Sequence, residues 1–373
     1  MNTTIVGNSK SIYVDGLFYG ESGIGRYTSS IIRMFLKRNF TVATAVPYSK
    51  REVFLNEYAN LSENLKVYFV NYSKFSLKGF LHLSFLLKKL EKESAVFIFP
   101  HINMPIYVPE RSIVVIHDLR PFTPFWDRGK IKRYILYRLY SRAMKKAKAV
   151  VCISRTVQEE LESIFPKYSK KIHVVKNTYE SSLVEIDIGS KSNVHGSYIL
   201  FVGNRKWYKN IGGLIKAFQL IKDEISHNLL ILGKGESDSD EYDALTRELN
   251  LERRVKHIKN ADDNTLAALY KHADLFVMPS FYEGFGFPPF EAVYFGCPAI
   301  FSDIPIFREL WGEAGLYFDP HKPEDIAEKI FTVLVNKDFR DKLLEKQKRV
   351  LENFTEDKMA EKFIQVIEKV LST

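Results

Sequence analysis

The sequence predicts an α/β protein with two domains, each built on a doubly wound parallel β-sheet. The chain has 373 residues, which suits two domains of roughly 150–200 residues better than one hydrophobic core. Short apolar runs alternate with helix-patterned segments along the chain, and this series occurs twice. A polar stretch from Tyr179 to Gly196 separates the two series and is the expected interdomain linker.

The first series contains short apolar or β-branched runs with helical patterns between most of them. Such uninterrupted apolar runs are typical of parallel strands that are covered on both faces. We expect helices at 26–38, 131–146 and 156–165. The expected strands are Ile12–Asp15, Thr41–Pro47, Val67–Val70, Val96–Phe99, Ile113–His117, Ala149–Ile153 and Ile172–Val175.

The second series has the same organisation and ends in a long helix. After Thr355 the pattern predicts one amphipathic helix, charged on one side, with Phe363, Val366, Ile367 and Val370 on the other. A helix is also expected at Ile211–Ile221. The expected strands are Tyr198–Val202, Asn228–Leu232, Val255–Ile258, Leu275–Met278, Ala299–Phe301 and Leu316–Phe318.

The composition is that of a soluble globular protein, with 46% hydrophobic and 27% charged residues. No stretch approaches the roughly 20 consecutive apolar residues of a membrane span, and the first ten residues lack the order of a signal peptide. Cys152 and Cys297 lie among apolar neighbours and are expected to be buried thiols. We therefore expect a cytoplasmic protein without a disulfide framework or a metal cluster.

The two halves of the chain differ in charge. Residues 1–180 hold 29 of the 54 basic residues and 14 of the 45 acidic ones, so the N-terminal half is strongly basic and the remainder mildly acidic. Segments 74–92 and 128–148 combine lysines and arginines with apolar residues at near-helical spacing. They predict basic helices on an anionic membrane surface, so that the protein would be peripheral on the inner face of the cell membrane.

Two alternatives to membrane contact stay open at this point. Either segment could instead be an ordinary core helix with a solvated basic face. Nucleic acid is a competing anionic partner, but no recognisable nucleic-acid module accompanies the charge, so no nucleic-acid partner is expected.

The most informative segment is MPSFYEGFGFPPFEAVYFGCPAIFSD, residues 278–303. Glu283 lies on a loop after a predicted strand, and Glu291 falls in the first turn of a helix expected at 290–295. Between them lies a glycine turn, Gly284-Phe285-Gly286. The carboxyl ends of strands in an open α/β sheet are where ligands bind, and carboxylates there suit a polyhydroxylated ligand.

Two further loops carry the features of anion-binding sites. Gly20 to Gly25 lies between the first strand and a helix expected to begin near Arg26, where backbone N–H groups can approach a phosphate. The loop from Gly203 to Asn210 follows the first strand of the second series and carries Arg205, Lys206 and Lys209. These cations are well placed to balance a diphosphate. A solvated basic turn is the alternative for this loop.

Two shorter features are weaker indications of function. His117 ends a predicted strand, where it could hydrogen-bond a sugar hydroxyl or stabilise developing charge, although most single histidines are structural. Asp238-Ser239-Asp240 imitates a metal-binding Asp-x-Asp motif, but it lies in an acidic run rather than at the end of a buried strand. No metal site is expected there.

Taken together, these motifs resemble the family 4 retaining glycosyltransferases of the GT-B fold. The resemblance rests on Gly23-Ile24-Gly25-Arg26-Tyr27, Ile116-His117-Asp118-Leu119, Ile153-Ser154 and the Gly203 to Asn210 loop. It also rests on the Glu283…Glu291 pair, Ser302-Asp303 and Ala314-Gly315…Asp319-Pro320. The motifs are ordered from about residue 12 to residue 325, and the segment with the two glutamates is the most specific.

The resemblance implies two Rossmann-like domains facing a cleft. Residues 1–178, completed by a C-terminal helix at 357–373 that crosses back, would bind the acceptor, and residues 179–356 would bind the nucleotide sugar. It implies catalytic or near-catalytic roles for His117 and Glu283 at the sugar and for Lys209 at the diphosphate. The implied donor-binding residues are Gly23, Gly25, Asn204, Arg205, Lys209, Gly284, Phe285, Gly286 and Glu291.

One departure from the family concerns the diphosphate site. Many members have an arginine directly after the glycine of this loop, where the chain has Asn204. Arg205 or Lys206 is therefore the expected second phosphate-binding cation.

The function implied is transfer of a hexose, with retention, from a nucleotide-diphosphate sugar to a glycan, without a metal or another cofactor. GDP-mannose is slightly favoured as donor and a UDP-hexose is possible. The acceptor would be lipid-linked, in bacterial surface polysaccharide synthesis of the O-antigen or capsule type. The alternatives are an epimerase or phosphorylase of the same fold, or a non-enzymatic binder that uses the basic half.

Overall fold

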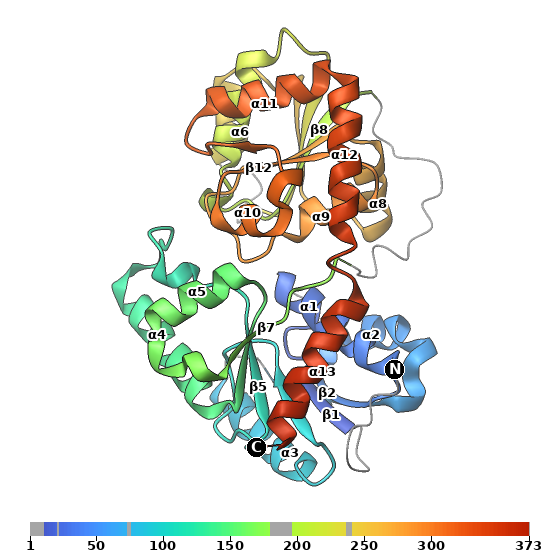
Figure 1. Cartoon of the computed structure of the whole chain (residues 1–373), viewed down its shortest axis with the longest axis vertical. Coiled ribbons are helices and arrows are strands. Elements are labelled where there is room, and N and C mark those ends of the chain that lie inside the picture. The colour runs from blue at the N-terminus through green and yellow to red at the C-terminus, as the bar shows by residue number, and fades with distance from the viewer. Residues whose placement is uncertain (1–10, 21, 73–75, 180–195, 236–240, 373) are drawn as a thin grey trace. The chain divides into compact units, whose positions relative to one another are not determined.

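The structure, a computed structural model, describes residues 11–20, 22–72, 76–179, 196–235 and 241–372 (Figure 1). It divides into two compact units. Unit 1 comprises Met1–Ser181 and Glu356–Thr373, and unit 2 comprises Ser182–Thr355. Each unit has one sheet in which every strand pair is parallel, so the predicted α/β fold is confirmed.

Unit 1 contains a seven-stranded sheet in the order β3-β2-β1-β4-β5-β6-β7. The chain moves outward from β1 in one direction through β2 and β3, and then in the other direction from β4 to β7, as in a doubly wound sheet. The strands are β1 (Ser11–Asp15), β2 (Thr41–Pro47), β3 (Leu65–Val70), β4 (Val96–Phe99), β5 (Ser112–Ile116), β6 (Ala149–Cys152) and β7 (Ile172–Val174). The helices are α1 (Ser22–Leu36), α2 (Arg51–Glu57), α3 (Leu77–Leu90), α4 (Gly129–Lys146), α5 (Arg155–Ile164) and α13 (Glu356–Ser372).

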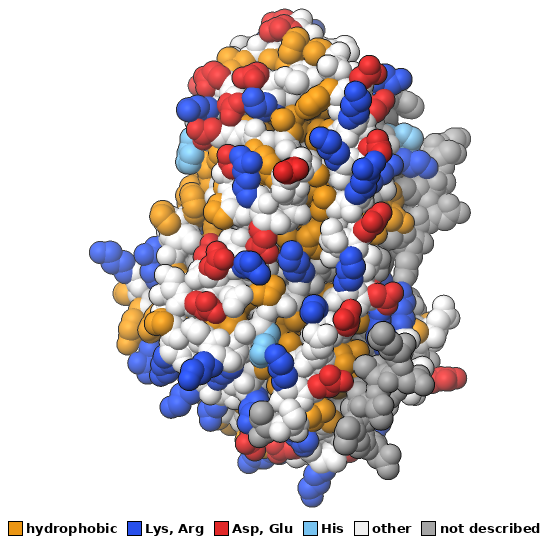
Figure 2. Space-filling view, viewed as in Figure 1, with side chains coloured by type: hydrophobic (Ala, Val, Ile, Leu, Met, Phe, Trp, Pro, Cys, Tyr) orange, Lys and Arg blue, Asp and Glu red, His pale blue; other side chains and the backbone are white. Residues whose placement is uncertain are grey.

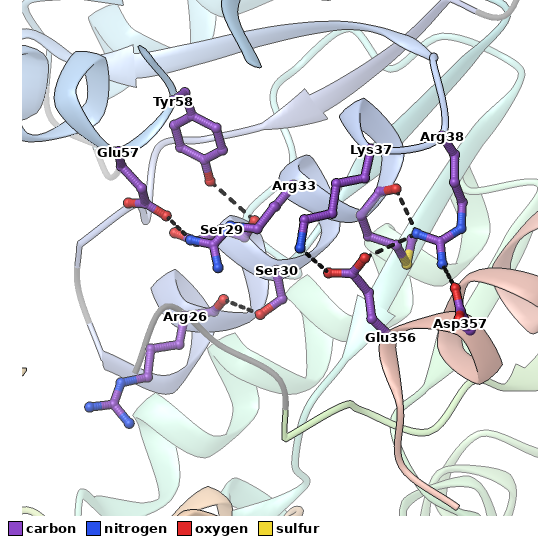
Figure 3. Close-up of polar contacts among 11 residues, drawn as sticks. Arg26, Ser29, Ser30, Arg33, Lys37, Arg38, Glu57, Tyr58, Glu356 and Asp357 are labelled. Carbon is purple, nitrogen blue, oxygen red and sulfur yellow. Dashed lines mark hydrogen bonds and ion pairs between the residues drawn. The ribbon is translucent and has the colours of Figure 1, made fainter. Parts of the chain in front are cut away.

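The C-terminal helix α13 belongs to unit 1, as predicted, and packs on α1 (Figure 3). The four apolar residues expected on its inner side are buried, and the ring of Phe363 meets that of Phe35 edge-on at 5.7 Å. At its first turn, Arg38 Nη1 donates to Glu356 Oε1 at 3.1 Å, and Arg38 also pairs with Asp357. Apolar packing and an ion-pair cluster thus both hold this helix.

Unit 2 contains a six-stranded sheet in the order β10-β9-β8-β11-β12-β13. Its strands are β8 (Tyr198–Val202), β9 (Asn228–Leu232), β10 (Val255–Ile258), β11 (Leu275–Met278), β12 (Ala299–Ser302) and β13 (Tyr317–Phe318). Its helices are α6 (Ile211–Ile221), α7 (Glu241–Glu248), α8 (Asp263–His272), α9 (Phe287–Tyr294), α10 (Pro305–Trp311), α11 (Pro323–Val335) and α12 (Lys337–Leu351). The four residues of β11 are all buried, as the uninterrupted apolar run predicts.

Helix α4 differs from an ordinary core helix. Of the apolar residues at near-helical spacing, Ile131 and Ile135 are exposed, by 78% and 51%, and Tyr134 between them is also exposed. The helix instead buries Tyr140 and residues near its C-terminal end. Over α4, on the left edge of the view, basic and hydrophobic side chains lie next to one another on the surface (Figure 2).

Within the described part of the chain, no helix is both long enough and apolar enough to span a bilayer.

Candidate active site

The candidate site in unit 2 lies at the carboxyl edge of its sheet, between β8 and β11. The chain leaves β8 toward β9 on one side, whereas β11 begins the other half of the sheet. This is the topological switch point, where loops after neighbouring strands diverge and leave a crevice for a ligand. The loop after β8 carries Lys209, and the loop after β11 carries Glu283.

Lys209 and Glu283 meet at this switch point. The Nζ atom of Lys209 lies 2.5 Å from Oε1 of Glu283, and the two side chains are only 11% and 9% exposed. The hydroxyl of Ser280 donates to the same carboxylate oxygen at 2.8 Å. The nearly buried ammonium group of Lys209 is thus held in place beside a carboxylate. Such a group can form a charge-assisted hydrogen bond with an anionic group of a ligand.

The two loops are also joined through their backbones. The N–H of Phe281 donates to the carbonyl of Tyr208 at 2.8 Å. The 3₁₀ helix Trp207–Lys209 ends at Asn210, which adopts a left-handed conformation with φ of 55°. The side-chain amide of Asn210 donates to the carbonyl of Pro320, in the loop after β13, at 2.7 Å. The position of Lys209 is therefore fixed by contacts with two other loops.

The start of the loop after β8 packs closely against the backbone of the loop after β9. A Cβ atom added at Gly233, directly after β9, would lie 1.7 Å from the carbonyl oxygen of Gly203. The loops after β8 and β9 approach each other so closely that no side chain fits there.

Helix α9 begins at Phe287, three residues earlier than predicted. Pro288 and Pro289 lie in its first turn, where a missing N–H costs no hydrogen bond and the fixed φ suits a helix. Gly286 precedes the helix with φ of +82°, a conformation that side-chain-bearing residues rarely adopt. Glu291 therefore lies in the second turn and not in the first, which corrects the predicted position.

Glu291 is buried, with 1% of its surface exposed. Its Oε2 atom accepts a hydrogen bond from the hydroxyl of Tyr270 on α8, at 2.8 Å. This contact fixes the orientation of the carboxylate within unit 2. Phe285, between the two glutamates, is also buried and stacks on Phe290 at 5.0 Å. Gly284 is partly exposed.

Arg205, which also follows β8, contacts residues outside the Lys209–Glu283 pair. The Nη2 atom of Arg205 lies 3.0 Å from Nδ1 of His257 on β10 and 3.3 Å from Asp243 on α7. Because β10 and β11 lie on opposite sides of β8, His257, which contacts Arg205, and Glu283, which contacts Lys209, lie on opposite sides of this strand. Asn204 is exposed. The structure therefore brings Lys209, and not Arg205, to the switch point.

In unit 1 the glycine motif lies inside a helix and not in a loop before it. Helix α1 begins at Ser22, so Gly23 and Gly25 belong to its first turns. Gly23 is exposed, whereas Gly25 is buried against the loop after β1. A Cβ added at Gly25 would lie 2.6 Å from the carbonyl oxygen of Phe18. The absence of a side chain at Gly25 lets the helix pack on this loop.

His117 directly follows β5 and is oriented by unit 1 itself. Its Nε2 atom lies 2.8 Å from the carbonyl of Pro100, and because a carbonyl only accepts, Nε2 carries the proton. The edge of its ring meets Tyr27 at 4.8 Å. Burial lowers the pKa of His117 to about 4, so the ring is neutral at physiological pH and its Nδ1 atom is a hydrogen-bond acceptor.

Sequence analysis did not single out Ser280 or Tyr270, which hold the two glutamates. Ser280 could have been found from its place at the end of β11, next to Pro279. Tyr270 lies on a different helix and carries no local signal. Among the described residues there is no cluster of three or more histidine, cysteine or acidic side chains that could hold a metal, and the Asp238–Asp240 run lies outside them.

Each of the two units matches a known protein-family model. The model described as "Glycosyltransferase Family 4" matches residues 22–182, and the one described as "Glycosyl transferases group 1" matches residues 185–350. The chain belongs to glycosyltransferase family 4. Its fold is that of the GT-B members of this family.

Two curated relatives act on O-antigen chains according to their names. The O-antigen chain mannosyltransferase RfbU of Salmonella typhimurium is 31% identical over 220 residues, which are 59% of this chain and 59% of the relative. The O-antigen chain mannosyltransferase B of Escherichia coli is 28% identical over 248 residues, which are 63% and 65%. The matched region is thus less than two thirds of the length of either relative.

A solved structure shows the same fold in full. The Anabaena protein HepE, in a crystal structure with UDP and glucose, superposes with a TM-score of 0.71 over 96% of this family 4 chain and 99% of its own. At 14% sequence identity, this likeness establishes the fold alone.

Proposed function

We propose that this protein is a glycosyltransferase that moves a hexose from a nucleotide-diphosphate sugar to a glycan acceptor. The observation that carries the proposal is the Lys209–Glu283 pair at the switch point of unit 2, in a chain that belongs to family 4. The named relatives act on O-antigen chains, so bacterial surface polysaccharide is the proposed pathway class and a lipid-linked glycan the proposed acceptor. We favour GDP-mannose as the donor because both relatives are mannosyltransferases by name, and a UDP-hexose is the second candidate.

In the proposed reaction, the bond between the sugar C1 and the diphosphate oxygen breaks, and the acceptor hydroxyl oxygen forms a bond to C1. The diphosphate leaves with additional negative charge, and Lys209 is the cation proposed to stabilise it without a metal, which its nearly buried position supports. The acceptor proton passes to the departing phosphate oxygen. Attack on the same face of the sugar would retain its configuration.

The two glutamates have separate proposed roles. Glu283 is already charge-paired with Lys209, so it suits hydrogen bonding to the donor sugar better than acid–base work. Glu291, oriented by Tyr270, is the proposed partner of the nucleotide ribose. His117 is proposed to contact the sugar through its unprotonated Nδ1 atom, and Gly23 at the start of α1 to face the diphosphate.

We also propose that α4 contacts an anionic membrane. It presents Ile131, Tyr134 and Ile135, one helical turn apart, to solvent, with no acidic residue in the helix. Helix α3 adds Leu81 and Phe85, exposed by 45% and 70%. Basic side chains beside exposed apolar ones suit the interface of an anionic bilayer, where the apolar groups insert and the charges meet lipid headgroups.

A thermal-shift panel of GDP, UDP, ADP and their sugars tests the donor, because a ligand that binds only the folded state raises the melting temperature. One nucleotide class is expected to raise it and the others not. A protein that none of them stabilises would contradict the proposal. Membrane contact is tested separately with vesicles of phosphatidylglycerol and phosphatidylcholine. Binding to the anionic vesicles should fall in high salt and in the I131S/I135S variant.

A further inference from the structure

A second polar pair lies at the switch point of the other sheet. In unit 1 the switch point falls between β1 and β4, which are paired in parallel with Val14 opposite Ile98. Asp15 is the last residue of β1, and His101 is two residues beyond the end of β4. The two side chains therefore occupy in unit 1 the place that Lys209 and Glu283 occupy in unit 2.

The Asp15 side chain is fully buried, and only one of its two carboxylate oxygens has a hydrogen-bond partner in the described chain. Its Oδ1 atom accepts the N–H of Leu17 at 2.9 Å. Its Oδ2 atom has no hydrogen-bond partner among the residues that the structure describes. A buried carboxylate oxygen without a partner is costly, so an oxygen left in this state indicates that something else donates to it.

The side chain of His101 also has one ring nitrogen without a hydrogen-bond partner in the described chain. It is 3% exposed, and its Nδ1 atom accepts the N–H of Asn103 at 3.1 Å. The proton of the neutral ring is therefore on Nε2, which finds no hydrogen-bond acceptor in the described chain. The Nε2 atom lies 3.8 Å from Asp15 Oδ1, too far for a direct hydrogen bond.

A ring N–H and a carboxylate that lie this close together without a direct hydrogen bond are matched to a hydroxyl group. One hydroxyl oxygen can accept from His101 Nε2 and donate to the Asp15 carboxylate, whose Oδ2 atom lacks a partner in the described chain. A phosphate would be repelled by the Asp15 carboxylate. A hydroxyl both donates and accepts, so it satisfies both groups at once.

We propose that Asp15 and His101 form a subsite that binds a hydroxyl of the acceptor sugar. This inference rests on the proposed glycosyl transfer and adds a specific contact in unit 1. It assigns the pair to the acceptor because Lys209 and Glu291, the proposed partners of the diphosphate and of the ribose, belong to unit 2. A contact with the donor sugar instead would change the donor KM in the experiment below.

The surroundings hold the pair in place. The half-buried ring of Phe18 packs on His101 at 4.2 Å. A Cβ at Gly16 would lie 2.6 Å from Thr44 Oγ1, so the chain after Asp15 lies directly on β2. His117, the proposed sugar contact, is hydrogen-bonded to Pro100, the residue before His101. The loop after β4 thus carries His101 and also accepts the hydrogen bond of His117.

The alternative occupant is a buried water, which would give the pair a structural role only. Two variants separate these roles and keep the local hydrogen bonds. In Asp15→Asn the side-chain oxygen still accepts from Leu17, and in His101→Asn it replaces Nδ1 as acceptor from Asn103.

His227→Asn is the matched control. His227 Nε2 lies 3.7 Å from Asp274 Oδ2, nearly the same separation, but these residues immediately precede β9 and β11, at the opposite edge of a sheet. This histidine–aspartate pair therefore lies away from the carboxyl edge, where ligands bind.

Transfer would be measured with the methyl glycosides of mannose, glucose, galactose and N-acetylglucosamine as acceptor probes. We expect D15N and H101N to raise the KM for the accepted glycoside at least tenfold, to leave the KM for the donor within twofold, and H227N to change neither. An unchanged acceptor KM in both variants, or a change in donor KM instead, would overturn the subsite.

A binding measurement on the wild-type protein tests the Asp15–His101 subsite without relying on enzyme activity or on the folding of a variant. The Nε2–H resonance of His101, identified by its absence in H101N or by its coupling within the assigned ring, should shift when a glycoside is added. No shift with any glycoside at saturating concentration would overturn the subsite. If no glycoside accepts a sugar from any donor but this resonance shifts, the proposed function fails while the subsite stands.

Discussion

The ammonium group of Lys209 lies 2.5 Å from the carboxylate of Glu283, across 74 residues of sequence and between two neighbouring strands of one sheet. Both side chains are nearly buried, so each charge depends on the other for its solvation. This contact brings the loop after β8 to the loop after β11, and it places a cation where a diphosphate is proposed to bind.

Loss of Lys209 is expected to destabilise the protein as well as to inactivate it. Lys209→Ala leaves the Glu283 carboxylate nearly buried with Ser280 as a remaining donor, which should lower the free energy of unfolding by about 3 kcal/mol. Urea unfolding would measure the loss, and K209A/E283A should lose less than the sum of the two single variants.

The control is Arg349→Ala. Its partner Glu345 lies one helical turn away, and the two side chains are 71% and 65% exposed. That substitution should cost at most about 0.5 kcal/mol. Equal losses in R349A and K209A would contradict the importance assigned to the buried pair.

Two glycines in unit 2 should respond to alanine in opposite directions. Gly233→Ala forces a methyl group to within 1.7 Å of a carbonyl oxygen and should destabilise by roughly 3 kcal/mol or more. Gly212, inside α6, has its nearest neighbours at 3.7 Å, so Gly212→Ala should stabilise by about 0.5–1 kcal/mol through helix propensity. Thermal unfolding of the two variants checks both signs, and a stable G233A would show that the loops are not packed as described.

The pH dependence of stability should carry a contribution from His117. Because burial lowers its pKa in the folded state to about 4, the folded protein binds fewer protons than the unfolded chain between pH 6.5 and 4. Its contribution is complete above about pH 6.5 and is lost as the pH falls through 4. Subtracting the stability curve of His117→Gln, which can still donate to Pro100, should isolate this slope. Parallel curves for the two proteins would contradict the depressed pKa.

The contact between α13 and α1 should contribute to the stability of unit 1. Arg38→Ala removes hydrogen bonds to Glu356, whose side chain is 10% exposed, and to Asp357. We expect a loss of about 1–2 kcal/mol, since hydrogen bonds between partly buried charged groups are stronger than those at the surface. Hydrogen exchange of α13 amides should increase in the same variant. Unchanged exchange would show that Phe363 and its apolar neighbours hold the helix without the ion pairs.

Strand positions could be predicted closely from the sequence, and helix starts less well. The run Leu275–Met278 is apolar throughout because β11 is covered on both faces, and it gave both ends of the strand correctly. The sequence predicts that Gly23 and Gly25 lie in an anion-binding loop before a helix that begins near Arg26, yet α1 begins before them. The packing of Gly25 against Phe18, which no local pattern reveals, explains that exception.

The candidate site was only partly predictable. A parallel sheet puts the loops after its strands at one edge, so the sequence suggests that Lys209 and Glu283 lie at the same edge. The strand order, in which β8 and β11 are neighbours, explains why the two residues lie close together. The direction of Arg205 could not be predicted, because it depends on Asp243 and His257 from elements on the other side of β8. The exposure of Ile131 and Ile135 on α4 was similarly hidden, since their spacing fits a buried helical face as well as a membrane-binding one.

The most direct test of the proposed function measures nucleoside diphosphate released from GDP-mannose and UDP-hexoses, with and without the methyl glycoside acceptors. We predict release from one donor that depends on an acceptor, a fall of about 100-fold or more in K209A because the leaving diphosphate loses its cation, and no change in R349A. Release that is independent of acceptor, or a K209A variant as active as the wild type, would contradict it.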